Sequence, residues 1–258
     1  MSAPVAIVTG ATSGIGRAAA LRLARDGFTI LACGRNAERG QNAVDAVLNT
    51  LDNGQREAQT AHFLSFDVTR EAEWSDIADR VLRDHGAPSV LVNCAGSFFT
   101  RPLPETTLDE FRELWRVDVE SVVLGTKYGF AMMAKGDRVG SIVNVSSLAG
   151  LIGLEDCAAY CAAKAAVTHF SRVSALEGAQ MNPKVRVNSL NPGVIYTEMI
   201  TGAYGDSEAV RDFVKDGNAL DRVGTADDIA SAVAYLAGPA SRMVTGSVLL
   251  VDGGRGAD

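Results

Sequence analysis

The sequence predicts an α/β fold in which a doubly wound, seven-stranded parallel sheet is covered by helices on both faces. Two observations predict it. Short, continuously apolar runs alternate with amphipathic stretches along the whole chain of 258 residues. Strands that are apolar on both faces are typical of parallel sheets, whose crossover helices bury both sides. No linker, low-complexity tract or internal repeat divides the chain, so residues 1–258 are expected to form one domain.

The expected strands and helices follow one another in regular alternation. Strand candidates are short runs rich in Val, Ile and Leu, and helix candidates show apolar residues at helical spacing. The strands are expected at Val5–Thr9, Thr29–Cys33, Ala61–Phe66, Val90–Asn93, Ser141–Ser146, Val185–Leu190 and Ser247–Val251. The helices are expected at Gly16–Asp26, Ala37–Leu51, Glu71–His85, Leu108–Met133, Cys157–Gln180 and Ala226–Ala237.

One segment, residues 192–224, interrupts this alternation with a mixed sequence. Connections of this length in a compact domain are commonly lids or binding loops. The segment also follows the carboxyl end of a late strand, which is the edge where open α/β sheets bind ligands. It is therefore predicted to be a substrate-binding loop or lid.

The amino-acid composition excludes several kinds of binding partner. A net charge of -7 argues against nucleic acid or an anionic membrane as the main partner, and no apolar run approaches the ~20 residues of a membrane span. The four cysteines form no CxxC pair, so they are expected to be structural and no metal site is predicted. A reducing, cytoplasmic compartment is the expected location.

A glycine-rich turn, Thr9-Gly10-Ala11-Thr12-Ser13-Gly14-Ile15-Gly16, joins the first strand to the first helix. Glycines allow a tight turn and let backbone N–H groups at a helix N-terminus approach a pyrophosphate. Such a turn is also compatible with a plain strand–helix connection. Its place between a first strand and a long helix favours dinucleotide binding, and hence a Rossmann-type domain.

The end of the second strand indicates which dinucleotide binds. NAD sites usually hold the ribose 2′-hydroxyl with an acidic residue at this point, whereas NADP sites carry a cation. Here Gly34 is followed by Arg35 and Asn36, without a carboxylate. A charge-assisted hydrogen bond from arginine to a phosphate contributes roughly 1.5–3 kcal/mol. The alternative is a solvated arginine at the start of a helix, and NADP(H) is the favoured cofactor.

Three side chains suggest proton transfer. Tyr160 and Lys164 are four residues apart, so a helix places them on one face. Ser147 follows the predicted fifth strand, in the pair Ser146-Ser147. A Tyr/Lys pair on a helix and a serine pair at a strand end are each common surface features, and neither alone identifies a site.

Together, the motifs resemble those of the short-chain dehydrogenase/reductase family, specifically its subgroup of roughly 250 residues with a TGxxxGxG turn. The resemblance covers essentially the whole chain. It rests on motifs in a fixed order: TGATSGIG, Asp67-Val68, Asn93-Cys94-Ala95-Gly96, the trio Ser147/Tyr160/Lys164, Asn191-Pro192-Gly193 with Thr197, and Val251-Asp252-Gly253-Gly254.

The resemblance implies a role for each member of the trio. Tyr160 would exchange a proton with the substrate oxygen, Lys164 would hold the nicotinamide ribose, and Ser147 would hydrogen-bond the carbonyl oxygen. Because an unperturbed tyrosine has a pKa near 10, a base working near pH 7 needs roughly 4 kcal/mol of anion stabilisation. The implied cofactor contacts are Gly10, Thr12, Ser13, Gly14, Ile15, Gly16, Arg35, Asn36, Asp67, Val68, Asn93, Ala95, Gly96, Tyr160, Lys164, Pro192, Gly193, Ile195 and Thr197.

Asp118 departs from the family pattern, which often has Asn at this position to support a water relay to the lysine. The carboxylate is compatible with a relay role, with an ion pair to Lys164, or with a purely structural role. It is counted here among the candidate catalytic residues.

The residues expected to reach the substrate are largely apolar, which favours a hydrophobic or aryl ketone and its alcohol over a sugar or a charged acid. Packing in the core or in a subunit interface is the alternative for each. Besides Ser147 and Tyr160 they are Phe98, Phe99, Leu148, Leu154, Tyr196, Met199, Ile200 and Tyr204.

Two other functions compete with a ketone reductase. The motifs also resemble those of 3-oxoacyl-carrier-protein (or CoA) reductases, although the acidic net charge is unfavourable for an acidic carrier. A catalytically silent NADP-binding regulator is the rival from another class, but the retained Tyr160 and Lys164 argue against it. The resemblance further implies a homotetramer, with the helices Leu108–Met133 and Cys157–Gln180 at its contacts.

Overall fold

The computed structural model describes residues 3–52, 54–55, 60–216 and 218–257 and contains the predicted seven-stranded sheet. All neighbouring strands are parallel, in the order β3-β2-β1-β4-β5-β6-β7. The strand order reverses between β1 and β4, and ligands bind at such a point. The strands are β1 Val5–Thr9, β2 Thr29–Gly34, β3 Ala61–Ser65, β4 Val90–Asn93, β5 Gly140–Val145, β6 Val185–Pro192 and β7 Val248–Val251.

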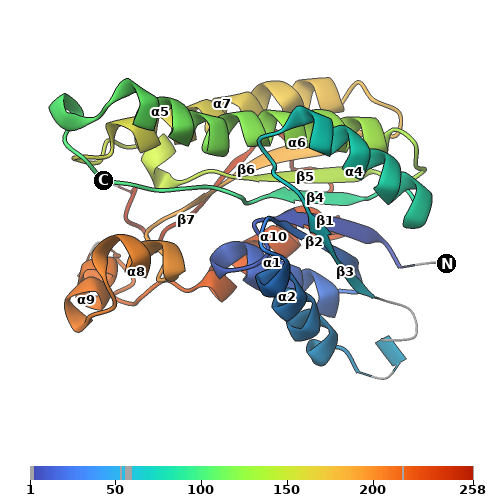
Figure 1. Cartoon of the computed structure of the whole chain (residues 1–258), viewed down its shortest axis with the longest axis horizontal. Helices are drawn as coiled ribbons and strands as arrows, with labels where there is room; N and C mark the ends of the chain where they lie inside the picture. Colours follow the sequence, from blue (N-terminus) through green and yellow to red (C-terminus); the bar gives the residue numbers. More distant parts are fainter. Residues whose placement is uncertain (1–2, 53, 56–59, 217, 258) are drawn as a thin grey trace.

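Helices cover both faces of the sheet, as the sequence predicted (Figure 1). One face carries α4 (Glu71–Asp84), α5 (Leu108–Trp115), α6 (Ser121–Met133) and α7 (Ala158–Gly178), and the other carries α1 (Gly14–Arg25), α2 (Ala37–Thr50) and α10 (Ala226–Ala237). Alternate residues of β1 serve the two layers: Ala6 and Val8 pack in one core cluster, and Ile7 in the other. This is why the strands are apolar without interruption.

The predicted helix Leu108–Met133 is interrupted by one π-helical turn, Arg116–Glu120, between α5 and α6. A π turn inserts an extra residue into the helical repeat and is frequent at functional sites. Here the turn contains Asp118, whose side chain is fully buried. The turn therefore places a carboxylate inside the protein.

The segment 192–224 contains two short helices, α8 (Glu198–Tyr204) and α9 (Glu208–Asp216), where the sequence suggested an irregular loop. Val210 and Val214 form the buried side of α9. A bridge between Ile195 and Gly224 closes the base of the segment.

Among the residues that the structure describes, no helix has the length and apolar character needed to cross a membrane.

Candidate active site

The glycine turn packs closely against the loop that follows β4. Gly10 has a φ of +66°, and a Cβ there would lie 3.0 Å from the backbone of Ala95. A Cβ on Gly16 would lie 2.3 Å from the carbonyl oxygen of Gly10. The Gly14 N–H lies at the start of α1 and takes no part in the helix hydrogen bonds. It donates to the Glu198 carboxylate at 3.1 Å. This turn therefore already holds an anionic oxygen, as a pyrophosphate site requires.

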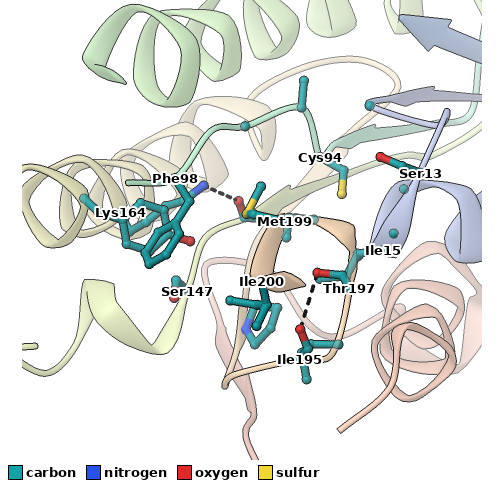
Figure 2. Close-up of a pocket in the computed structure, with 18 of the residues that line it drawn as sticks. Ser13, Ile15, Cys94, Phe98, Ser147, Lys164, Ile195, Thr197, Met199 and Ile200 are labelled. Atoms are coloured by element: carbon teal, nitrogen blue, oxygen red, sulfur yellow. Dashed lines mark hydrogen bonds between the residues drawn. The ribbon is translucent and has the colours of Figure 1, made fainter. Parts of the chain in front are cut away.

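A cavity of about 650 Å³ extends from this turn along the carboxyl edge of the sheet (Figure 2). Figure 2 shows Ser13 and Ile15 toward one end, and Ser147, Lys164 and Phe98 toward the other. Most of the residues predicted to contact the cofactor line it: Gly10, Thr12, Ser13, Gly14, Ile15, Gly16, Arg35, Asp67, Val68, Ala95, Gly96, Tyr160, Lys164, Pro192, Gly193, Ile195 and Thr197.

Two residues of the predicted cofactor set do not line the cavity. Asn36 caps α2, with its side-chain oxygen accepting from the Arg39 N–H at 2.9 Å. Asn93 is buried beneath the cavity, and its Nδ2 donates to Asn144 Oδ1 at 2.9 Å. Both side chains thus hydrogen-bond other parts of the protein and do not line the cavity.

The adenosine end of the cavity contains two arginines. Arg35 lies at the end of β2, and Arg39, which the sequence reasoning missed, lies one helical turn further on. Burial tends to raise the pKa of Asp67, but hydrogen bonds from Thr69 and the charges of Arg35 and Arg116 outweigh it and lower that pKa. The Asp67 carboxylate and the Arg35 guanidinium thus lie within electrostatic reach of each other.

The two serines after β5, Ser146 and Ser147, make different contacts. Ser146 donates its hydroxyl to the Lys164 carbonyl oxygen at 2.8 Å and is buried. Ser147 Oγ accepts from the Ala149 N–H at 3.1 Å, and the serine side chain also hydrogen-bonds Tyr160. Asn191 holds the Ser147 carbonyl oxygen through its Nδ2 at 2.7 Å. Asn191 thus positions the serine that faces the cavity.

Tyr160 and Lys164 both lie on α7, one turn apart, as predicted. The Lys164 Nζ is 5.5 Å from the centre of the Tyr160 ring. On its other side, Nζ forms an ion pair with Asp118 Oδ2 at 2.9 Å. The other carboxylate oxygen of Asp118 accepts from the N–H and the hydroxyl of Ser97, at 2.7 and 3.0 Å. Of the three roles considered for Asp118, the geometry matches the ion pair.

Burial and neighbouring side chains shift the pKa values of Tyr160 and Lys164. Burial raises the pKa of Tyr160, Lys164 lowers it, Asp118 raises it and a hydrogen bond with Ser147 lowers it, with a net increase. Burial tends to lower the pKa of Lys164, but Asp118 and Tyr160 outweigh it and raise that pKa. The side chains alone therefore do not supply the tyrosinate stabilisation that a base near pH 7 needs.

The substrate end is lined by most of the predicted apolar residues. Phe98 packs edge-on against Tyr160, with ring centres 4.9 Å apart. Tyr196 does not line the cavity; its hydroxyl donates to Asp206, and Arg211 lies 4.4 Å from its ring centre. Phe99 packs in a small core cluster with Tyr160. The cavity-lining members are Phe98, Leu148, Leu154, Met199, Ile200 and Tyr204, joined by Cys157, Phe213 and Arg255, which the sequence reasoning missed.

Fold and cavity together define a dinucleotide-binding oxidoreductase, and the comparisons with known proteins agree. A family model described as enoyl-(acyl carrier protein) reductase matches residues 10–255. Cyclopentanol dehydrogenase from Comamonas sp. is 36% identical over 250 residues, covering 97% of this chain and 96% of that protein. The NADP-dependent (R)-specific alcohol dehydrogenase from Lentilactobacillus kefiri is 33% identical, with coverages of 97% and 95%.

A crystal structure of a short-chain type dehydrogenase/reductase from Mycobacterium marinum superimposes with a TM-score of 0.85 at 26% identity, covering 98% of this chain and 95% of that one. The chain belongs to the short-chain dehydrogenase/reductase family. It is an oxidoreductase of the alcohol dehydrogenase type, and its family uses a nicotinamide cofactor.

The ion pair leads to a prediction about Tyr160. Asp118→Asn keeps the shape of the side chain but removes a negative charge that raises the Tyr160 pKa. The pKa of Tyr160 is therefore expected to fall in this variant. Ultraviolet titration of tyrosinate measures it, with Tyr160→Phe in both backgrounds subtracted to isolate the one residue. An unchanged or higher pKa would show that the carboxylate does not act on the tyrosine.

Proposed function

We propose that this protein is an NADP(H)-dependent carbonyl reductase and secondary-alcohol dehydrogenase that acts on hydrophobic ketones, aryl ketones included, and their alcohols. The observation that carries the proposal is one continuous cavity with three features. Ser147, Tyr160 and Lys164 gather at one end, Arg35 lies at the other, and apolar side chains form the wall beside the tyrosine. A proton donor, a dinucleotide cradle and an apolar substrate wall are the parts that ketone reduction requires.

The residues present fit a nicotinamide dinucleotide. The glycine turn presents an N–H that binds an anionic oxygen, and the backbone at Gly10 and Gly16 is too crowded for any side chain. Asp67 and Val68 line the cavity, and so does Thr197 beside the glycine turn, where its hydroxyl donates to the Ile195 carbonyl oxygen at 3.3 Å (Figure 2). When bound, the cofactor supplies or accepts the hydride.

The side chains manage the proton and the developing charge. Tyr160 donates its hydroxyl proton to the carbonyl oxygen during reduction and accepts it back during oxidation. Ser147, whose side chain hydrogen-bonds Tyr160, donates to the same carbonyl oxygen when the substrate is bound and stabilises the charge that develops there. The Lys164 ammonium lowers the pKa of Tyr160 and so favours the tyrosinate that remains after transfer.

Asp118 is proposed to act as a positioning residue in this scheme. It holds the Lys164 ammonium through the buried ion pair and keeps that lysine charged. Its own negative charge opposes ionisation of Tyr160. Asp118 would thus fix the geometry of the lysine and shift the working pH of the tyrosine upward.

The assignment of Tyr160 is tested by Tyr160→Phe, which removes the hydroxyl and keeps the ring that packs on Phe98. Ketone reduction is expected to fall by about 10²–10⁴-fold, the usual contribution of a general acid. Calorimetry should show unchanged NADPH binding. Tyr235→Phe, a change at an exposed ring, serves as the matched control. If Tyr160→Phe kept more than about a tenth of the wild-type rate, the proton would come from another group.

The same assay separates the rival functions. Simple ketones, aryl ketones and 3-oxoacyl thioesters should be compared as substrates with both NADPH and NADH. A carrier-protein or CoA reductase would prefer the thioesters. A silent regulator would bind the dinucleotide and reduce none of the compounds.

NADP(H) preference is proposed from the two arginines beside the cavity. Both Arg35 and Arg39 border the end where the adenosine ribose would lie, and no carboxylate replaces Gly34. A dianionic 2′-phosphate gains charge-assisted hydrogen bonds there, whereas a 2′-hydroxyl gains little. The relative from Lentilactobacillus kefiri is an NADP-dependent alcohol dehydrogenase, which is in line with this preference.

Arg35→Ala is expected to raise the KM for NADPH about tenfold or more, because one lost charge-assisted hydrogen bond corresponds to at least about 1.4 kcal/mol. The KM for NADH should stay nearly constant. Arg39→Ala is expected to act in the same direction, and the exposed Arg25→Ala, at the far end of α1, is the control. Equal weakening of both cofactors, or equal use of both by the wild type, would refute the NADP assignment.

Gly34→Asp, an obvious route to an NAD-preferring variant, meets a steric limit. A Cβ at Gly34 would lie 2.9 Å from the Thr12 methyl group. The methyl belongs to a side chain that can rotate, but the glycine turn around it is tight. Substitution of Gly34 therefore needs an accompanying Thr12→Ser change, and Arg35→Ala is the cleaner test.

A homotetramer and a cytoplasmic location are also proposed. The outer face of α7 exposes Ala158, Ala162 and Ala165, and further along Val173 and Leu176. These small and apolar side chains suit close contact with a second copy, as the family resemblance implies. All four cysteines are free, which is compatible with a reducing compartment.

Light scattering tests the assembly, with a tetramer as the expected species. Leu176→Glu, which places a charge on a side chain that is 73% exposed in the single chain, should reduce the assembly state. Val139→Glu, at a site that is 62% exposed and directly precedes β5, should leave the assembly state unchanged. A monomer at micromolar concentration, or a tetramer that tolerates Leu176→Glu, would contradict this interface.

A further inference from the structure

The chain after β7 forms a tight turn around a buried carboxylate. Asp252, which is 8% exposed, accepts from the Gly254 N–H at 3.0 Å and from the Gly256 N–H at 2.6 Å. Gly253 and Gly254 have φ values of +66° and +86°, which side-chain-bearing residues rarely adopt. The turn fixes the backbone of Arg255, whose N–H donates to the Asp252 carbonyl oxygen at 3.3 Å.

The side chain of Arg255 lines the cavity, at its substrate end. Its guanidinium carbon lies 5.5 Å from the centre of the Phe213 ring. That ring belongs to an aromatic series that reaches the proton donor: Phe213 and Tyr204 are 5.9 Å apart, Tyr204 and Phe98 6.2 Å, and Phe98 and Tyr160 4.9 Å. The series connects Arg255 to the tyrosine and not to the adenosine pocket.

A second contact supports this placement. A Cβ built on Gly256 would lie 2.6 Å from Leu148 Cδ1. Leu148 follows Ser147 directly and is itself a wall of the cavity. The residue after Arg255 therefore packs beside the residue after the catalytic serine, so the terminal turn forms part of the substrate wall.

One nitrogen of the guanidinium, Nη1 of Arg255, is buried and has no hydrogen-bond partner among the described residues. Among the described residues Arg255 also forms no ion pair, although three acidic residues line the cavity: Asp67, Glu155 and Glu198. Glu198 is engaged with the Gly14 N–H, and Glu155 is exposed. Burying a charged hydrogen-bond donor without a partner costs free energy, unless a bound ligand accepts its hydrogen bond.

We propose that Arg255 is a substrate-recognition residue that binds a carboxylate on the substrate. The substrate class is then an oxo acid, or the corresponding hydroxy acid, with an apolar body between the reacting carbon and the carboxylate. This inference rests on the proposed function and refines it. The body of the substrate lies against Phe98, Leu148 and Tyr204, and its far end pairs with the guanidinium. It departs from the expectation that a charged acid is excluded.

A singly charged, planar anion fits this site better than a phosphate. The guanidinium fork matches the two oxygens of a carboxylate, and the ring of Phe213 restricts its other face. Of the described residues, Lys164 is the other cation at this end of the cavity, and its charge is already paired with Asp118. Glu155 and Glu198 line the same cavity and repel multiple negative charges. A monoanion gains the ion pair with the least repulsion.

The test compares oxo acids of increasing length with their methyl esters, in ketone reduction by the full protein with NADPH. For at least one length, the wild type is expected to show a kcat/KM about tenfold or more higher for the acid than for its ester, equivalent to about 1.4 kcal/mol. Arg255→Gln should abolish this acid-to-ester ratio, and Arg255→Lys should retain part of it. Arg242→Gln, an exposed arginine outside the cavity, is the matched control.

Calorimetry provides a readout that does not depend on turnover. Saturated carboxylic acids without a keto group should bind the NADP-loaded wild type more tightly than their methyl esters, and Arg255→Gln should remove the difference. The inference is overturned if neither readout shows a preference for acids, if the preference survives Arg255→Gln, or if that change raises the KM for NADPH instead. Absence of reduction of every ketone and ester, with acid binding retained, would reject the proposed function alone.

Discussion

The buried ion pair between Lys164 and Asp118 is the constraint around which the Tyr160 end of the cavity is arranged. An ammonium placed beside Tyr160 loses its hydration, at a cost of several kcal/mol, unless an anion faces it. Three elements meet to provide that anion. The π turn between α5 and α6 brings Asp118 inward, and Ser97 holds it with two hydrogen bonds. Glycine at position 96 lets the backbone after β4 lie close to the carboxylate, since a Cβ there would be only 3.2 Å from Asp118 Oδ2.

The same pair has opposite effects on the tyrosine. Lys164 favours the tyrosinate and Asp118 disfavours it, so the carboxylate that makes the buried lysine tolerable also weakens its action on Tyr160. Burial adds to the disfavouring side. The proton therefore stays on Tyr160 unless a further positive charge approaches. A site arranged in this way transfers its proton most readily when the whole constellation, including a charged ligand, is assembled.

Local regularities made the fold predictable from the sequence, together with the gathering of Ser147, Tyr160 and Lys164 at one cavity. Continuous apolar runs predict a buried parallel sheet, and the strands β1 and β4 begin and end where they were expected. The four-residue spacing of Tyr160 and Lys164 places them on one helix face by geometry alone. That rule does not extend to Arg39, because Arg35 precedes the helix Ala37–Thr50 that contains Arg39.

The remaining contacts could not be predicted, because they join distant parts of the chain through the direction of single side chains. Tyr196 lies in the right segment, but Asp206 and Arg211 turn its ring away from the cavity. Arg255 follows a family motif at the end of the sequence, yet its place beside the substrate wall depends on how the terminal turn packs against Leu148. The carboxyl edge of the sheet gathers all strand ends, so late residues reach the site as directly as early ones. Substrate choice in such a fold is therefore determined largely by long-range packing at that edge, which local sequence patterns do not encode.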